Sequence, residues 1–334
     1  MRILLDGMGG DNAPEAIIQG AVSAQKLIDH EIIVIGQEDV ILPAKKKHGG
    51  KKLGFVPASE VISNDDAPVK AVRSKKDSSI VKGIELVKNG EADVFISAGS
   101  TGALMAGGLF ILGRIQGIDR PSLATVYPVI GQEPSLLIDA GANAECKPNN
   151  LLEFATMGSI YMEKVMGRKN PRVGLVNNGA EEHKGTTLTK AAHELLSRSP
   201  INFIGNVETR DLPNGVCDVI VTDGFTGNAL LKLTEGMGLM VLRELKKRFT
   251  KNGLTKMGSL FLGKELVNIK SEFNYVEYGG APILGVKGAI LKMHGSSDKI
   301  AVEKTILKAI PYVENNVVDV IQNSTVEIEE IVQS

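Results

Sequence analysis

The chain has little cysteine and almost no net charge. Its 334 residues include two cysteines, Cys146 and Cys217, and no Cys-x-x-Cys pair. This argues against a disulfide framework or a cysteine-based zinc site and fits a reducing compartment. Lysine and arginine total 38, against 39 aspartates and glutamates. The chain as a whole therefore offers no basic field for nucleic acid and no acidic tail, and a charged partner has to be met locally.

Long apolar runs are also missing. The most apolar stretch, residues 103–112, stops before Arg114 and is well short of the roughly 20 residues that cross a bilayer. The first residues enter a strand pattern directly and lack the charged, apolar and small-residue parts of a signal peptide. We therefore expect a cytoplasmic protein without a transmembrane helix.

The pattern that is present alternates short β-branched runs with helix-length segments. It begins with a strand at residues 2–5, a helix at 14–28 and a strand at 32–35. Further strands are expected at residues 53–56, 94–97, 123–127, 135–138, 173–176, 202–204, 219–222 and 283–286. This alternation predicts an α/β fold of three layers, α/β/α, with a mostly parallel sheet and an antiparallel hairpin over residues 123–138. No composition shift marks a boundary, so residues 1–334 are treated as one domain.

Residues 229–273 break the alternation and are expected to form a helical arm. Its basic residues include Arg243, Lys246, Lys247 and Lys251, and its later apolar residues at helical spacing are Leu254, Met257, Leu260 and Phe261. An amphipathic arm of this kind docks an acidic partner, lies on an anionic lipid surface or is buried against a dimer mate. The sequence leaves these alternatives open. Residues 297–332 are expected to form one or two amphipathic helices.

Two segments, residues 90–102 and 215–227, repeat one pattern at a constant offset of 125 positions. Each is a short strand, then Gly-x-Thr-Gly, then an apolar helix. A tight strand-to-helix turn leaves N–H groups unpaired at the helix N-terminus, where the helix dipole favours anions. The pair predicts an anion held between the turns, and the alternative is two ordinary turns. The residues concerned are Gly99, Ser100, Thr101, Gly102, Gly224, Thr226, Gly227 and Asn228.

Other strand ends are also rich in glycine and polar residues. They read Asp6-Gly-Met-Gly-Gly-Asp11, Asp139-Ala-Gly-Ala-Asn143 and Asn177-Asn-Gly-Ala-Glu-Glu-His-Lys-Gly185. Ligands of α/β sheets bind beyond the carboxyl ends of the strands, so these turns are candidates for a site. None has the Walker spacing, or Gly-x-Gly-x-x-Gly with an acidic residue downstream, and ATPase and standard dinucleotide-binding functions are therefore disfavoured.

Individual side chains within these turns have two interpretations each. Lys184 pairs with a phosphate or a developing oxyanion, and His183 acts as a general acid, or else their loop is simply solvated. His294 contacts a ligand or belongs to the start of the next helix, whose cap we expect at Ser296 or Ser297. Carboxylates suit Mg²⁺, but Asp11 and Asp223 also stand where a polar turn residue is expected, and no metal is assigned. The carboxylates are those of Asp6, Asp11, Asp139 and Asp223.

Together these strings closely resemble the PlsX family, the acyl-[acyl carrier protein]:phosphate acyltransferases of bacterial phospholipid synthesis. The likeness spans nearly the whole chain. Besides the first two strand-end strings above, it rests on Ser97-Ala-Gly-Ser-Thr-Gly-Ala103, Gly117-Ile-Asp-Arg-Pro121, Asn202-Phe-Ile-Gly-Asn-Val-Glu208, Thr222-Asp-Gly-Phe-Thr-Gly-Asn228, Tyr278-Gly-Gly-Ala281 and His294-Gly-Ser-Ser-Asp298. The chain departs from the family at Gly7, where alanine is usual, at Ser100, where asparagine is usual, and in the Asn178-Gly-Ala-Glu-Glu loop.

The resemblance implies a fold like phosphate acetyltransferase and the isocitrate/isopropylmalate dehydrogenases, and a homodimer. It also implies transfer of a fatty acyl group from acyl carrier protein to inorganic phosphate, without a cofactor and without an acyl-enzyme, because phosphate is the nucleophile and a thiolate leaves readily. The acyl phosphate would pass to a membrane glycerol-3-phosphate acyltransferase, which implies peripheral membrane association. The basic arm, residues 243–264, gains the acidic carrier protein as a natural partner.

On this basis Lys184, with His183, is expected to be catalytic. The expected substrate-binding residues are Asp6, Gly9, Gly10, Asp11, Gly99, Ser100, Thr101, Gly102, Asn143, Asp223, Gly224, Thr226, Gly227, Asn228 and His294. Two other functions stay open. One is a metal- and NAD-dependent hydroxyacid dehydrogenase on the same fold, for which Arg114 and Arg120 are too small an arginine cluster. The other is a non-catalytic scaffold that binds carrier protein at the membrane.

Overall fold

A computed structural model describes residues 1–251 and 279–333 of the chain. The strands are β1 (Arg2–Asp6), β2 (Glu31–Gly36), β3 (Gly54–Pro57), β4 (Val94–Ser97), β5 (Ser122–Tyr127), β6 (Ser135–Ile138), β7 (Val173–Asn177), β8 (Phe203–Glu208), β9 (Val219–Val221), β10 (Ala281–Leu284) and β11 (Ala289–Lys292). The helices are α1 (Glu15–Ala24), α2 (Glu38–Lys47), α3 (Pro68–Ser74), α4 (Ser79–Lys88), α5 (Thr101–Gly107), α6 (Pro148–Lys164), α7 (Thr187–Ser197), α8 (Gly224–Phe249), α11 (Lys299–Glu314) and α12 (Val317–Gln333). A π-helical turn, η1 (Gly108–Leu112), continues α5, and a short 3₁₀ turn, η2 (Leu212–Asn214), precedes β9.

The described strands form one sheet in the order β3-β2-β1-β4-β11-β10-β5-β6-β9-β7-β8. Neighbours are parallel except at the centre, where β11, β10, β5 and β6 pair antiparallel. The expected hairpin is confirmed, because Ala124 lies opposite Ile138 and Tyr127 opposite Ser135. The long crossovers that parallel pairing requires are supplied by the helices.

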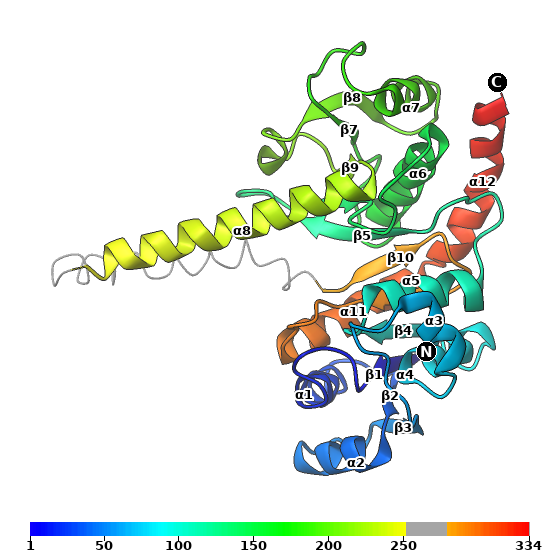
Figure 1. The fold of residues 1–334 in the computed structure, drawn as a ribbon, viewed down its shortest axis with the longest axis vertical. Coiled ribbons are helices and arrows are strands. Elements are labelled where there is room, and N and C mark those ends of the chain that lie inside the picture. Colours follow the sequence, from blue (N-terminus) through cyan, green and yellow to red (C-terminus); the bar gives the residue numbers. More distant parts are fainter. Residues whose placement is uncertain (252–278, 334) are drawn as a thin grey trace.

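Helices cover both faces of the sheet (Figure 1). In β1, Ile3 and Leu5 join a core beneath α1, α6, α7 and α11, while Leu4 joins a second core beneath α3, α4 and α5. A strand covered on both faces has no solvent side, which is why it reads as a continuous apolar run. The expected three-layer α/β/α architecture is confirmed.

Two expected strands differ from the structure in their bounds, and one observed strand was not expected. The expected strand at 283–286 is β10, which ends before Gly285, whose φ of +88° turns the chain toward β11. Strand β11 was not expected, because its four residues, Ala289–Lys292, are too few to separate a strand pattern from a turn. Strand β8 runs on to Glu208, and its polar residues fit an edge position, where one side of the strand lacks a neighbour.

The expected arm begins as α8, a helix of 26 residues that projects from the body of the molecule (Figure 1). Its large exposed apolar side chains include those of Leu233, Met237, Leu239 and Met240. The expected contact residues Leu254, Met257, Leu260 and Phe261 lie outside the described residues. Within the part of the chain that the structure describes, no helix combines the length and the apolar character of a membrane span.

Candidate functional site

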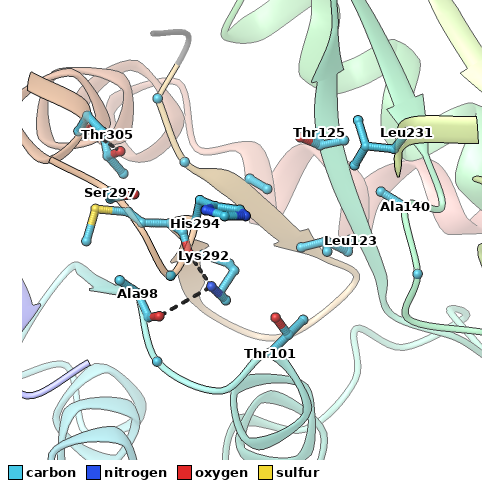
Figure 2. A pocket seen from close by; sticks show the side chains of 18 of the residues that line it. Ala98, Thr101, Leu123, Thr125, Ala140, Leu231, Lys292, His294, Ser297 and Thr305 are labelled. Atoms are coloured by element: carbon cyan, nitrogen blue, oxygen red, sulfur yellow. Dashed lines mark hydrogen bonds between the residues drawn. The ribbon is translucent and has the colours of Figure 1, made fainter. Parts of the chain in front are cut away.

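A cavity of about 450 Å³ lies at the centre of the sheet, where the antiparallel strands meet the turn after β4. Figure 2 shows Lys292, His294 and Thr101 around this space, with Leu123 and Leu231 across from them. The cavity thus has a polar part at the ends of β4 and β11, and apolar side chains opposite it, Leu123 of β5 and Leu231 of α8. Helix α8 also contributes the polar side chains of Asn228, Lys232 and Glu235 to the lining. Such a combination suits a ligand with one charged group and one apolar group.

Lys292, the last residue of β11, supplies a cation to the cavity. Its Nζ donates to the carbonyl oxygens of Ala98 (3.5 Å) and Met293 (Figure 2). Burial lowers the pKa of Lys292 from 10.5 to about 8, although the carboxylates of Asp6 and Asp11 oppose the change. The ammonium is therefore still charged at neutral pH, and its partial desolvation strengthens its attraction for a bound anion.

The first Gly-x-Thr-Gly turn is held by a buried chain of hydrogen bonds. The Ser97 hydroxyl donates to Asp6 Oδ2 (2.6 Å) and accepts from the N–H of Gly99 (2.9 Å). The N–H of Met8 donates to the other oxygen of Asp6 (3.0 Å). Because β1 and β4 are parallel neighbours, their carboxyl ends bring residues 6 and 97 together. Asp6 therefore positions the turn as well as contributing negative charge near Lys292.

The first Gly-x-Thr-Gly turn presents backbone N–H donors at the start of α5. Ser100 Oγ caps α5 by accepting from the N–H of Ala103 (3.4 Å). Among residues 1–251 and 279–333, no hydrogen-bond acceptor is found for the N–H groups of Thr101 and Gly102. Gly99 and Thr101 line the cavity. The structure thus places backbone donors and the Lys292 ammonium around one space.

The second Gly-x-Thr-Gly turn is used differently. Asp223 caps α8 by accepting from the N–H and hydroxyl of Thr226 (2.9 and 2.8 Å). The N–H of Gly224 donates to the carbonyl oxygen of Asn143 (2.7 Å). These internal bonds consume donors that an anion would need, and from this turn Asn228 alone among the described residues reaches the cavity lining. The two copies therefore contribute unequally, and an anion shared between them stays a prediction.

Asp139 organises the chain beside the second turn. Its fully buried carboxylate accepts from the N–H of Leu123 (3.0 Å), the N–H of Ala142 (3.1 Å) and both the N–H and side-chain amide of Asn143 (2.7 and 2.9 Å). Burial raises the pKa of Asp139, and these hydrogen bonds oppose the rise. The expected binding residue Asn143 is thus engaged with Asp139 and with the carbonyl of Pro121.

His294 follows Lys292 by two residues and lies at the cavity edge. Its Nδ1 accepts from the N–H of Ser296 (3.2 Å) and lies 2.7 Å from the Ser296 hydroxyl. An accepting Nδ1 places the proton of the neutral ring on Nε2. Partial burial, followed by the charge of Lys292, lowers the pKa of His294 below 6.5. At neutral pH the ring is therefore a neutral Nε2–H donor.

The helix cap expected at Ser296 or Ser297 is wrong. Asp298 caps α11, with Oδ1 accepting from the N–H groups of Ile300 (3.0 Å) and Ala301 (2.9 Å). A carboxylate at the helix N-terminus is the stronger cap because it also meets the positive end of the helix dipole. Ser297 is instead buried in the cavity lining, while Ser296 orients His294.

His183 and Lys184 lie elsewhere in the described structure. Both are exposed on the loop after β7, a strand separated from β5 by β6 and β9. The carbonyl of Lys184 accepts from the Asn177 side chain (3.2 Å), and neither side chain lines the cavity. Their catalytic role stays a prediction. Of the other expected residues, Gly99, Thr101, Asn228 and His294 line the cavity, and Asp11 lies next to it through the bond from its N–H to Gly295 (2.7 Å).

Lys292 is the main residue that sequence reasoning missed. The available signal was its place two residues before His294, but the short strand that carries it was not recognised. Within the described ranges, no cluster of three or more histidine, cysteine, aspartate or glutamate side chains is placed to hold a metal ion.

Comparisons with known proteins show the family of the chain. A family model described as "Fatty acid synthesis protein" matches residues 1–320. The chain is 52% identical over 321 residues to a phosphate acyltransferase of Alkaliphilus oremlandii, covering 96% of each chain. It is 48% identical over 321 residues to a phosphate acyltransferase of Clostridioides difficile, covering 96% of this chain and 94% of that one.

Solved structures give the fold class. A phosphotransacetylase from Streptococcus pyogenes matches with a TM-score of 0.63 at 17% identity, covering 96% of this chain and 94% of that one. A branched-chain phosphotransacylase from Enterococcus faecalis matches with a TM-score of 0.59 at 15% identity, covering 94% and 99%. The architecture is thus that of the phosphotransacylases. The chain belongs to the fatty acid synthesis protein family, the PlsX family of phosphate acyltransferases, and is an acyltransferase.

Proposed function

We propose that this enzyme transfers a fatty acyl group from acyl carrier protein to inorganic phosphate and releases acyl phosphate. The observation that carries the proposal is the partly buried, charged Lys292 near the backbone N–H groups of the first turn, with Leu123 and Leu231 on the opposite side of the cavity. Phosphate suits the cation and the donors, and the first carbons of an acyl chain suit Leu123 and Leu231.

The proposed reaction is a direct displacement. A phosphate oxygen forms a bond to the thioester carbonyl carbon, and the carbonyl electrons move onto its oxygen. When the tetrahedral intermediate collapses, the C–S bond breaks and the carrier thiolate leaves. Lys292 holds and neutralises the phosphate, and the Nε2–H of His294 donates to the developing oxyanion.

The cysteines support a path without an acyl-enzyme. Burial raises the pKa of Cys146 to about 11 and that of Cys217 to about 12. Both thiols are therefore protonated at neutral pH and are poor nucleophiles. Neither is part of the cavity lining, so phosphate itself is the nucleophile that this proposal requires.

The projecting helix α8 fits two further parts of the proposal. Its exposed apolar side chains, such as Leu233 and Met240, suit burial against a second copy of the chain in a homodimer. Its basic end suits an anionic lipid surface, which would keep the enzyme peripheral to the membrane and close to a glycerol-3-phosphate acyltransferase that consumes acyl phosphate. The basic residues are Arg243, Lys246, Lys247 and Lys251.

The experiment is to supply acyl carrier protein carrying a fatty acyl group together with ³²P-labelled phosphate. The expected result is labelled acyl phosphate and free carrier thiol in equal amounts. Binding of the carrier without turnover would favour the scaffold function instead. Turnover of a hydroxyacid that depends on NAD and a divalent metal would overturn the proposal in favour of the dehydrogenase.

A further inference from the structure

Helix α3 and the turn η1 form an exposed surface with apolar and basic side chains. Val69 is 42% exposed, and Phe110 is 52% exposed. The Arg73 guanidinium lies 5.4 Å from the centroid of the Phe110 ring, which joins the two elements into one surface. We name Val69, Lys70, Arg73, Leu109 and Phe110 the α3 patch. Large apolar side chains exposed next to one another mark interaction surfaces more often than isolated ones do.

The charge of the α3 patch has one sign. Lys70, Arg73 and the neighbouring Lys76 are exposed, and among the described residues no carboxylate forms an ion pair with them. In contrast, Lys75 is paired with Asp66 at 2.6 Å, on the inner side of the same segment. Residues 67–70, 73 and 74 also line a shallow hollow with mainly apolar walls. An acidic partner with an apolar centre fits such a surface.

The α3 patch adjoins the cavity. Helix α3 packs against α5, and Pro68 touches Gly102 of the first Gly-x-Thr-Gly turn closely enough to leave no space for a side chain there. Asn64, four residues before α3 begins, is part of the cavity lining. A thioester delivered over this edge therefore arrives directly at Thr101 and Lys292.

The basic end of α8 is much farther from the chemistry. At a rise of 1.5 Å per residue, Lys246 lies about 27 Å along the helix from Asn228, which lines the cavity. Figure 1 shows this end projecting away from the body, whereas α3 lies on the body beside α5. The geometry favours α3 over the arm for a partner that has to deliver a reactive group.

We propose that the α3 patch is the docking surface for the acyl carrier protein. This inference rests on the proposed function, which makes an acyl thioester on an acidic carrier the substrate. Carboxylates of the carrier would pair with Lys70, Arg73 and Lys76, while Val69 and Phe110 cover its apolar centre. The carrier's flexible thiol arm would then pass Asn64 and place the thioester in the cavity.

The experiment measures binding and turnover of full-length variants. Lys70→Glu combined with Arg73→Glu is expected to raise Kd and KM for acyl carrier protein about tenfold, and Phe110→Ser several-fold, since charged rim and apolar centre contribute separately. The KM for phosphate should stay unchanged. Turnover of the same acyl group on free pantetheine should also be unchanged, which shows that the variants are folded.

Two matched controls sharpen the test. Lys51→Glu with Lys52→Glu reverses the charge of two exposed lysines that are not part of the α3 patch and should leave carrier binding unchanged. Lys246→Glu with Lys247→Glu reverses the charge of two lysines on the arm and should also leave carrier binding unchanged. If the arm variant loses carrier affinity and the α3 variant keeps it, the proposal is overturned.

Other outcomes are equally decisive. A change from dimer to monomer in the α3 variants, seen by analytical ultracentrifugation, would assign the α3 patch to a second copy of this chain and overturn the proposal. Absence of acyl phosphate formation by the unaltered enzyme would instead remove the proposed function. The carrier Kd values would still decide the docking surface in that case, so the two failures are distinguishable.

Discussion

The Asp6 carboxylate accepts a hydrogen bond of 2.6 Å from the Ser97 hydroxyl, across 91 residues of sequence. The same hydroxyl accepts a hydrogen bond from the N–H of Gly99, so one buried serine joins the end of β1 to the first Gly-x-Thr-Gly turn. Because Asp6 and Ser97 are both inaccessible to water, the loss of either hydrogen bond would lower the free energy of unfolding. The turn that we propose to bind phosphate is therefore held in place by a residue outside the cavity lining.

Ser97→Ala should weaken phosphate binding and stability together. The variant leaves Asp6 and the Gly99 N–H without this partner, which costs about 1–3 kcal/mol of unfolding free energy. We expect a lower urea midpoint and a KM for phosphate raised several-fold. Ser199→Ala is the matched control, because its hydroxyl donates to a helix-end carbonyl far along the chain. Unchanged phosphate KM in Ser97→Ala would show that the turn does not bind phosphate.

Lys292→Met should abolish most activity without unfolding the protein. Removing a preorganised charge that stabilises the transition state typically costs about 10²–10³ in kcat. Because the substitution also removes a partly desolvated ammonium, the unfolding free energy should stay the same or rise. Initial rates and chemical denaturation check both statements. Activity within threefold of the unaltered enzyme would exclude Lys292 from the site.

The pH dependence of phosphate binding should follow Lys292. Its pKa of about 8 in the folded protein, against 10.5 normally, means that the ammonium is lost as pH rises through 8. Affinity for phosphate should therefore fall above that pH. Between pH 8 and 10.5 the unfolded chain holds the additional proton, so this lysine makes stability rise with pH there. A Lys292→Arg variant stays charged and should lose the decline in phosphate affinity, as measured by calorimetry.

Glu153→Gln should alter the pH dependence of stability. Burial raises the pKa of Glu153 from 4.5 to about 7, while the N–H groups of Asp119 and Arg120 donate to its Oε2 (3.1 and 3.2 Å). In this window the folded protein holds the additional proton, so the carboxyl makes stability fall as pH rises from 4.5 to 7. Glutamine keeps an acceptor and removes that decline. The check is to measure the melting temperature of both proteins from pH 5 to 8. Parallel curves of melting temperature against pH for Glu153→Gln and the unaltered protein would contradict the prediction.

Lys184→Ala tests the residue that the sequence favoured. If the exposed loop after β7 approaches the substrates during the reaction, turnover should fall severely while the melting temperature is unchanged. Lys190→Ala, on the helix that follows the loop, is the control for a general effect of removing a lysine nearby. Near-normal rates in Lys184→Ala would leave Lys292 as the cation at the centre of the proposed chemistry.

Most of the fold was predictable because the segments with a clear apolar pattern in the sequence are also the segments that are buried in the structure. Strands such as β1 and β4 are covered on both faces, and their unbroken apolar runs show this directly in the sequence. The exceptions were short or polar: β11 has four residues, and β8 carries polar residues at the sheet edge. Helix caps were less predictable, because serine and aspartate are both good N-cap residues and only the geometry of the turn decides which of them caps the helix.

The sequence by itself determined the α/β class, the hairpin, the family and the turns at the strand ends, because these depend on local periodicity and on strings of adjacent residues. Only the tertiary structure decided which turns share a cavity. Pairing of β11 with β4 brings Lys292 beside Ala98, 194 residues away along the chain, whereas the loop that carries Lys184 lies beyond β6 and β9. The two Gly-x-Thr-Gly turns look alike in sequence but differ in hydrogen bonding. The N–H of Gly224 donates to the carbonyl oxygen of Asn143, which lies far away along the chain, whereas the N–H of the matching Gly99 donates to the nearby Ser97 hydroxyl.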